Sequence, residues 1–283
     1  MRITLPAASQ RVARTVWRDG AKARDAQERA IPEEAAIAFT YGGSSYAVMM
    51  ATPRDLEDFA YGFTLTEGVA SPDEIENLEI IPEDSGIELR MRLVAPQEHA
   101  YAERRRHLAG PTGCGLCGIE SLTEAVRDLP KVSSKEVFTP EEIMRAVSSL
   151  PAGQSLNNET RAVHAAAFWK RGQGLVALRE DVGRHNALDK LAGALARNST
   201  AAGDGIVVVT SRLSVEMIQK AAMMSAPLIV AVSAPTALAL RAADEAGITV
   251  AAIARGDGFE IFTHPERIVL EAAQGTGNVA LGA

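Results

Sequence analysis

Residues 206–254 read IVVVTSRLSVEMIQKAAMMSAPLIVAVSAPTALALRAADEAGITVAAIA, and this stretch decides the fold. The runs at 206–210, 228–232 and 248–254 are short, apolar and rich in β-branched residues, as buried parallel strands are. The two segments between these runs have helical patterns. Regular alternation of strand and helix predicts an α/β sandwich of three layers.

Two apolar segments upstream of this stretch, at 162–170 and 174–178, are joined by Arg171-Gly172-Gln173. A short connection that contains glycine predicts a hairpin. An antiparallel pair beside parallel strands makes the predicted sheet mixed. Residues 141–150 form a predicted helix, and a further helix is predicted to start at Ile119, just after two cysteines.

The first third of the chain is predicted to be rich in strands. Residues 35–41 and 45–50 flank the glycine pair of a predicted hairpin. A second pair of strands is predicted within residues 75–94. We therefore divide the chain into a strand-rich N-terminal subdomain, 1–105, and an α/β domain, 106–283.

One helix is predicted between the two strand pairs. Thr52 has the side chain of an N-cap, and Pro53 suits the first helical position. Apolar residues follow at helical spacing, and Gly68 suits the end of the helix.

Composition limits the classes of function. The chain has 283 residues, 47% of them hydrophobic, and a net charge of −7. We do not expect a general nucleic-acid binder, because such proteins need a basic surface. No apolar run is long enough to span a membrane, so we expect a cytoplasmic protein without a membrane partner. Two cysteines are too few for a disulfide framework, and their close spacing favours redox, metal or sulfur chemistry.

The two cysteines lie in the motif Gly113-Cys114-Gly115-Leu116-Cys117-Gly118. The predicted helix from Ile119 places them near a helix N-terminus, where unpaired amides and the helix dipole stabilise a thiolate. Such a thiolate can take up a sulfur atom as a persulfide and pass it on. Thiol–disulfide exchange is one alternative use of the pair, and half of a zinc site is another.

A zinc deaminase is the most specific form of the zinc alternative. His164-Ala165-Ala166 has the histidine of such a site, but Ala166 stands where the proton-transferring glutamate is needed. The cysteine pair also precedes the histidine, which is opposite to the deaminase order. We therefore predict no metal site and leave His164 without a role.

A charged segment at 179–190 follows the predicted hairpin. Asp181 is predicted to cap a helix, so that Arg184, His185 and Asn186 project from the helix N-terminus into a pocket that can hold phosphate. The alternative is a charged helix start with no ligand.

Three further turns directly follow predicted strands, at 211–217, 233–236 and 255–258. The first two are rich in hydroxyls and backbone donors, and ligands of open α/β sheets bind at the carboxyl ends of strands. Together the turns predict an anion or nucleotide site. For Ser214 and Thr236 the alternative is that each only caps a helix.

With these motifs in place, the chain resembles the FdhD family, the formate dehydrogenase accessory sulfurtransferases. The matching stretches are distributed from about residue 31 to 265. They are IPEE at 31–34, TPRD at 52–55, TGCGLCG at 112–118, VHAAA at 163–167, the segments 180–190 and 211–220, SAPT at 233–236 and ARGD at 254–257. Two small departures from the family pattern, VMMA at 48–51 and Leu213, do not involve the cysteines.

The resemblance implies a function that the residues alone do not show. By this resemblance, the chain is expected to carry sulfur from a cysteine desulfurase to the bis(molybdopterin guanine dinucleotide) molybdenum cofactor. This sulfur transfer is expected to help activate formate dehydrogenase. The resemblance also implies a homodimer, binding of guanine nucleotide and a cytidine-deaminase-like α/β core. The alternative function is a cofactor-binding chaperone whose cysteines are dispensable.

The resemblance also assigns candidate site residues. Cys114 is identified as the persulfide-bearing cysteine, and Cys117 is a second catalytic candidate that carries sulfur or only assists. The cofactor-binding candidates are Ile253, Ala254, Arg255, Gly256, Asp257 and Gly258, together with Arg184, Arg212, Ser233 and Thr236. Three of the arginines and Lys220 give the positive charge that two pyrophosphates need. The turn at 233–236 is expected to read the guanine ends.

Overall fold

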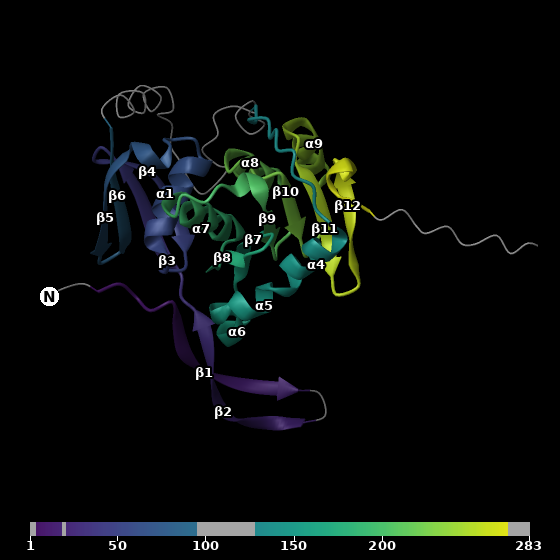
Figure 1. Cartoon of the computed structure of the whole chain (residues 1–283). Coiled ribbons are helices and arrows are strands. Elements are labelled where there is room, and N and C mark those ends of the chain that lie inside the picture. Colours follow the sequence, from purple (N-terminus) through teal and green to yellow (C-terminus); the bar gives the residue numbers. More distant parts are fainter. Residues whose placement is uncertain (1–3, 19–20, 95–127, 271–283) are drawn as a thin grey trace, which may run out of the picture.

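The computed structural model describes residues 4–18, 21–94 and 128–270. The described chain forms two sheets, helices that pack between and around them, and a two-stranded arm that points away from the body (Figure 1). The cysteine motif at 111–118 and the helix predicted from Ile119 lie outside the described residues.

Among the described residues the larger sheet has six strands, in the order β12-β11-β10-β9-β7-β8. They are β7 (His164–Lys170), β8 (Gly174–Asp181), β9 (Ile206–Val209), β10 (Leu228–Ala231), β11 (Thr249–Arg255) and β12 (Gly258–Thr263). β9, β10 and β11 are parallel, whereas β7 runs antiparallel to β9 and β12 antiparallel to β11. The sheet is therefore mixed, as the hairpin predicted.

Helices cover both faces of this sheet. One face carries α7 (Arg184–Arg197), α8 (Val215–Met223) and α9 (Ala237–Ala246), and the other carries α4 (Pro140–Ser148) and α5 (Leu150–Gly153). Alternate strand residues fill the two cores, since Val207 and Val209 face α7–α9 while Ile206 and Val208 face α4. These are the three layers that the alternation predicts. The likeness to a deaminase core stays a prediction.

The smaller sheet lies in the N-terminal part and has the strand order β4-β3-β6-β5. Its strands are β3 (Ala35–Tyr41), β4 (Ser44–Ala51), β5 (Ile75–Glu83) and β6 (Gly86–Leu93). Helix α1 (Leu56–Thr66) packs on it through aromatic rings: Phe39 stacks on Phe63 at 3.9 Å and meets Phe59 edge-on at 4.9 Å. The two predicted strand pairs are confirmed, and the division at residue 105 stays a prediction.

The predicted start of α1 is wrong. The N-cap is Asp55, with a backbone φ of 54°, and its side chain makes no capping hydrogen bond. Thr52 lies three residues earlier, fully buried, where its hydroxyl accepts a hydrogen bond from the backbone N–H of Val182 at 3.2 Å. A long-range partner thus takes the group that the sequence offers as a cap. The predicted end is correct, because Gly68 has a φ of 68° just after the helix.

The arm consists of β1 (Ser9–Arg18) and β2 (Ala21–Pro32), which pair with each other. The sequence did not predict it, because most described side chains of β1 are exposed and its apolar residues do not alternate with polar ones as they do on a half-buried strand. The remaining short elements of the described chain are α6 (Ser155–Thr160), η1 (Pro72–Glu74), η2 (Ala202–Asp204) and η3 (Pro265–Arg267).

Helices α1 and α7 cross so closely that neither has room for a Cβ atom at the crossing point, where Gly62 and Gly193 lie. A Cβ placed on Gly62 would lie 1.7 Å from the backbone oxygen of Asp189, and one on Gly193 would lie 1.8 Å from the backbone oxygen of Asp58. Glycine at both positions lets the two backbones touch. This crossing joins the helix of the smaller sheet to the helix of the larger one.

We expect Gly62→Ala to lower the free energy of unfolding by about 3 kcal/mol, because the new methyl group must push two backbones apart. Urea denaturation followed by circular dichroism measures this. Gly203→Ala is the matched control, since the nearest atom to its added Cβ is 3.8 Å away. Equal stability of the two variants would contradict the close crossing.

Candidate functional site

The turns that the sequence singled out lie along one edge of the larger sheet. β8, β9, β10 and β11 run in the same direction, so their carboxyl ends share that edge. The first residue of antiparallel β7, His164, lies at the same edge, opposite Asp181 in the ladder. This is the edge where α/β sheets bind their ligands.

Backbone hydrogen bonds connect neighbouring turns along this edge. The N–H of Thr236 donates to the carbonyl of Leu213 at 2.9 Å, and the N–H of Ile253 donates to the carbonyl of Ser233 at 3.2 Å. Two of the cofactor-binding candidates, Ser233 and Ile253, are therefore direct neighbours, and Thr236 is bonded to the residue after Arg212. Thr236 also caps α9, since its hydroxyl accepts from the N–H of Ala239 at 3.2 Å.

Ile253 holds an unusual backbone conformation at the end of β11. Its φ is 55°, a left-handed value that a side chain branched at Cβ rarely adopts. Strain of this kind concentrates at functional sites. The residues that follow, Arg255, Gly256 and Asp257, are exposed at the edge, where β11 turns into β12, whereas Ala254 is buried.

Arg184 and His185 lie at the other end of the row, in the first turn of α7. The Nε of Arg184 is buried and has no hydrogen-bond partner within the described residues. Burial, with the positive charges of Arg184 and Lys220, lowers the pKa of His185 to about 4. Burial and the charge of Arg184 also lower the pKa of His164. An anion bound here would meet a partly desolvated guanidinium with two uncharged imidazoles nearby.

Arg184 and Arg255 are too far apart to hold one phosphate. Four strand steps separate β8 from β11. Strands lie about 4.8 Å apart, so the two turns are about 19 Å apart. Arg212 is exposed on the turn after β9, between them. A ligand that uses all three arginines must be long and must carry several separated charges.

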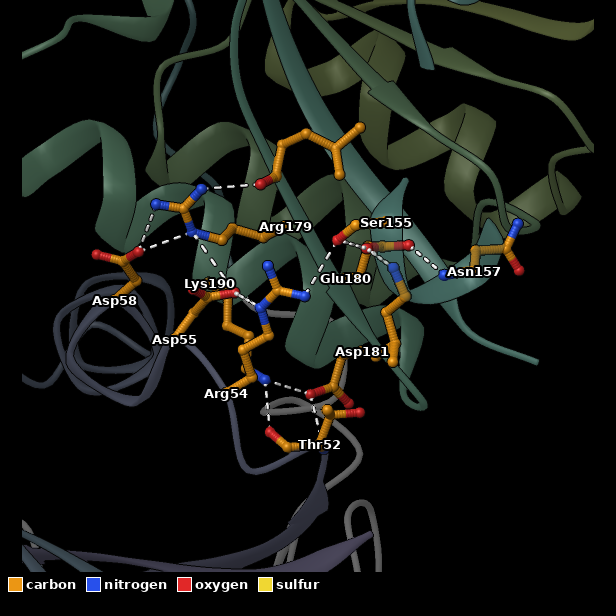
Figure 2. Close-up of polar contacts among 12 residues, drawn as sticks. Thr52, Arg54, Asp55, Asp58, Ser155, Asn157, Arg179, Glu180, Asp181 and Lys190 are labelled. Carbon is orange, nitrogen blue, oxygen red and sulfur yellow. Dashed lines mark hydrogen bonds and ion pairs between the residues drawn. The ribbon is translucent and has the colours of Figure 1, made fainter. Parts of the chain in front are cut away.

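Asp181 fixes the start of α7, although not as the predicted cap. The N-cap is Gly183, and Asp181 is the last residue of β8. Its buried carboxylate accepts from the N–H of Gly183 at 2.8 Å and from the side chain of Asn186 at 2.9 Å. The second oxygen accepts from the N–H of Thr52 at 3.0 Å and from Lys190 at 2.5 Å. The strand end, the helix start and the N-terminal part thus meet on one carboxylate, and Figure 2 shows its contacts with Thr52 and Lys190.

Lys190 is the cation of this buried cluster, with no exposed side-chain surface. Its ammonium also donates to the carbonyl of Thr52 at 2.8 Å. Burial lowers the pKa of Lys190, and the adjacent Asp181 opposes that change. Removal of one partner of such a pair costs about 3–5 kcal/mol, because the other charge stays buried.

The two residues before Asp181 tie β8 to two other helices. Arg179 forms an ion pair with Asp58 of α1 at 2.6 Å. The carboxylate of Glu180 accepts from the backbone N–H groups of Leu156 and Asn157, both at 2.8 Å, at the start of α6. Figure 2 shows both contacts beside the Asp181 cluster. Three consecutive side chains therefore hold α1, α6 and α7 around one strand end.

Two residues that the sequence placed in the anion pocket are buried elsewhere. Lys220 pairs with Asp189 at 2.9 Å and with Glu67 at 2.7 Å, inside the junction of α1, α7 and α8. Asn186 is buried and donates to Asp181 and to the carbonyl of Met50 at 2.8 Å. Lys220 faces the helix junction, and Asn186 faces the ends of β4 and β8. Neither is available to a phosphate at the edge.

The structure does not place Cys114 and Cys117, which lie outside the described residues. Within the described ranges, no group of three or more His, Cys, Asp or Glu side chains is arranged to hold a metal ion. None of the described helices is long and apolar enough to cross a membrane.

The buried polar residues of the helix junction and of the β8 strand end are what sequence reasoning missed. Thr66, for example, donates its hydroxyl proton to Asp189 at 2.6 Å, inside the helix junction. The available signal was the position of Asp189 and Lys190 among apolar residues on α7, where charged side chains need buried partners.

Known proteins of one family are similar to this chain over most of its length. The FdhD/NarQ family matches residues 32–269. The "Sulfur carrier protein FdhD" of Agrobacterium fabrum is 53% identical over 95% of this chain and 99% of its own length. The protein of the same name from Cupriavidus necator is 46% identical over 91% of this chain and 89% of its own. A crystal structure of a putative formate dehydrogenase accessory protein from Desulfotalea psychrophila is similar, with a TM-score of 0.71, 25% identity, and coverage of 93% of this chain and 100% of the other.

The low pKa of His185 leads to a pH dependence of stability. The unfolded chain takes up a proton on this residue near pH 6.5 but the folded chain only near pH 4, so stability is lost as the pH falls through that window. Between pH 7 and pH 5 we expect a loss of about 1–2 kcal/mol that His185→Asn removes. Urea denaturation of both proteins at the two pH values measures it. The same loss in the variant would show that His185 is not buried beside Arg184.

Proposed function

Because the chain belongs to the FdhD/NarQ family, we propose that it is a sulfur carrier that serves a formate dehydrogenase. The observation that carries this proposal is the extent of the likeness to proteins named sulfur carriers, which spans both the cysteine motif and the sheet edge. The similar accessory protein supports the link to formate dehydrogenase.

The sulfur is carried on Cys114 as a persulfide. Its thiolate attacks the terminal sulfur of a persulfide on a cysteine desulfurase. A new S–S bond forms at Cys114 while the S–S bond of the donor breaks, and the donor leaves as a thiolate. No net oxidation occurs, so no further reactant is needed. The glycines around the pair and the predicted helix start support this chemistry, and Cys117 assists or relays the sulfur.

The sulfur acceptor is the bis(molybdopterin guanine dinucleotide) molybdenum cofactor, bound as a substrate along the sheet edge. It is long and carries two pyrophosphates, which suits arginines about 19 Å apart. Arg184 and the segment 253–258 hold opposite parts of it, and Arg212 contributes charge between them. The turn with Ser233 and Thr236 offers backbone groups to a guanine. Guanine nucleotides alone bind the same edge.

The protein works with a cysteine desulfurase as donor and a formate dehydrogenase as recipient, and it forms a homodimer. Its α/β core is related to that of cytidine deaminases. The position of His164-Ala165-Ala166, at the start of a sheet strand beside the proposed site, supports that relation.

We expect Cys114→Ala to abolish sulfur transfer and the activation of formate dehydrogenase, because the atom that accepts the sulfur is gone. Cys117→Ala should cause a smaller loss. Delivery of labelled sulfur from a desulfurase, with formate dehydrogenase activity as second readout, measures both. Matched thermal unfolding of the variants serves as the control for folding.

A Cys114→Ala protein that still activates formate dehydrogenase at the wild-type rate would favour the chaperone alternative. Equal and complete loss in both variants would instead indicate a relay that needs the two sulfur atoms together.

We expect Arg184→Ala and Arg255→Ala each to weaken the binding of a guanine nucleotide by roughly tenfold to a hundredfold. A charge-assisted hydrogen bond to phosphate contributes about 1.5–3 kcal/mol, and 1.4 kcal/mol is about a factor of ten. Titration calorimetry measures the affinity. Arg145→Ala, an exposed change on α4 at the opposite face of the sheet, is the control. Unchanged affinity in both site variants would show that the nucleotide does not bind at this edge.

A further inference from the structure

The described part of the arm formed by β1 and β2 has no apolar core of its own. Trp17 is 75% exposed and Val12 is 41% exposed. A two-stranded sheet is at best marginally stable in water unless something covers it. Exposed tryptophan beside arginine is also the composition of contact hot spots at protein interfaces. The arm therefore has the features of a surface that is covered in the working protein.

The arm nevertheless keeps a fixed place on the body. Arg29 of β2 donates to the carbonyl of Thr160 at 3.0 Å, and Ser9 donates to the carboxylate of Glu159 at 3.3 Å. Both partners belong to α6 or its end. The root of the arm is closed by a hydrogen bond from the N–H of Glu33 to the carbonyl of Ala8 at 2.8 Å. A held arm loses less entropy on docking than a free segment.

The charge of the arm is opposite to that of the rest of the chain. Residues 9–32 contain six arginine or lysine residues and three acidic ones, although the net charge of the whole chain is −7. Arg11 and Arg14 are exposed, and neither forms an ion pair with any described residue. Another copy of this acidic chain is therefore an electrostatically favourable partner for the arm.

An acidic groove lies next to the root of the arm. It has a volume of about 450 Å³ and runs between the N-terminal segment and the β5–β6 turn. Its charged lining residues are all acidic, namely Glu33, Glu34, Glu83 and Asp84, and its apolar lining includes Pro6, Pro82 and the half-exposed Met50. The groove thus combines negative charge with apolar surface, as a contact for arginine and tryptophan requires.

We propose that the arm of each protomer docks in the acidic groove of a second copy. The two contacts are the same in both directions, as in a two-fold symmetric dimer. Glu33 belongs both to the groove and to the root of the arm, so the two surfaces adjoin on each chain. A two-fold axis beside the root then brings each arm to the other groove. The arm has 24 residues from Ser9 to Pro32, and a standard interface uses about 20–30 residues on each side.

This inference gives the proposed homodimer its contact surface, and it leaves the sulfur chemistry as proposed. Two charge-reversed proteins test it. The arm variant carries Arg11→Glu and Arg14→Glu, and the groove variant carries Glu34→Lys and Glu83→Lys. Arg145→Glu with Arg241→Glu, two exposed changes on α4 and α9, is the matched control. Circular dichroism and thermal unfolding confirm that each variant folds.

Analytical ultracentrifugation over a concentration series gives the dimer Kd of the full chain. We expect wild type and control to dimerise equally, and each reversed variant to dimerise about a hundredfold more weakly or worse, because like charges meet across both contacts. Mixing the arm variant with the groove variant should restore the dimer, since both arms then face a groove of opposite charge. Trp17→Ala should also weaken it.

A monomeric wild type, or an arm variant that dimerises like wild type, would overturn the proposal. A mixture that stays monomeric would overturn the groove as the docking site. Sulfur loading of Cys114 by a desulfurase is measured on the same samples. Loading that persists in monomeric variants separates the failure of the dimer from any failure of the sulfur carrier function.

Discussion

The backbones of α1 and α7 touch where Gly62 crosses Gly193, and the rest of the structure depends on that contact. No Cβ fits on either helix at this point. The closeness brings the N-terminal part near enough for Thr52 to reach the carboxylate of Asp181. A buried carboxylate with four hydrogen-bond donors is then satisfied by groups from both halves of the chain. Without the crossing, that charge would be buried and incompletely paired.

The functional consequence lies at the strand end. Arg179, Glu180 and Asp181 each hold a different helix, so the turn that carries Arg184 starts from a fixed point. A positive group that is fixed and partly desolvated binds an anion more strongly than a mobile group in water. At the far end of the row, the strained backbone of Ile253 is held by a bond to the neighbouring turn. These contacts fix both ends of the edge that we propose as the binding surface for a long anionic ligand.

Sequence reasoning found the elements that have a buried apolar face, because such faces leave a periodic pattern. The strands from β7 to β11 and their helices were predicted for this reason, as was the row of turns at their ends. It missed the arm, because the described side chains of β1 are mostly exposed, and it misplaced Thr52, Asp181 and Lys220. Each of these three polar groups has a partner more than a hundred residues away in the chain. Local patterns predict a cap or a phosphate ligand there, because the distant partner leaves no local trace.

The proposed function needs a cysteine pair that holds sulfur and a sheet edge that holds the molecule receiving it. Everything in it depends on Cys114 as the residue that carries the sulfur atom. A mass spectrum of the protein after incubation with a cysteine desulfurase and cysteine tests this directly. We expect the mass of one added sulfur atom, located on the peptide of Cys114 and removed by a reducing agent. An unchanged mass, or sulfur found only on Cys117, would show that Cys114 is not the carrier.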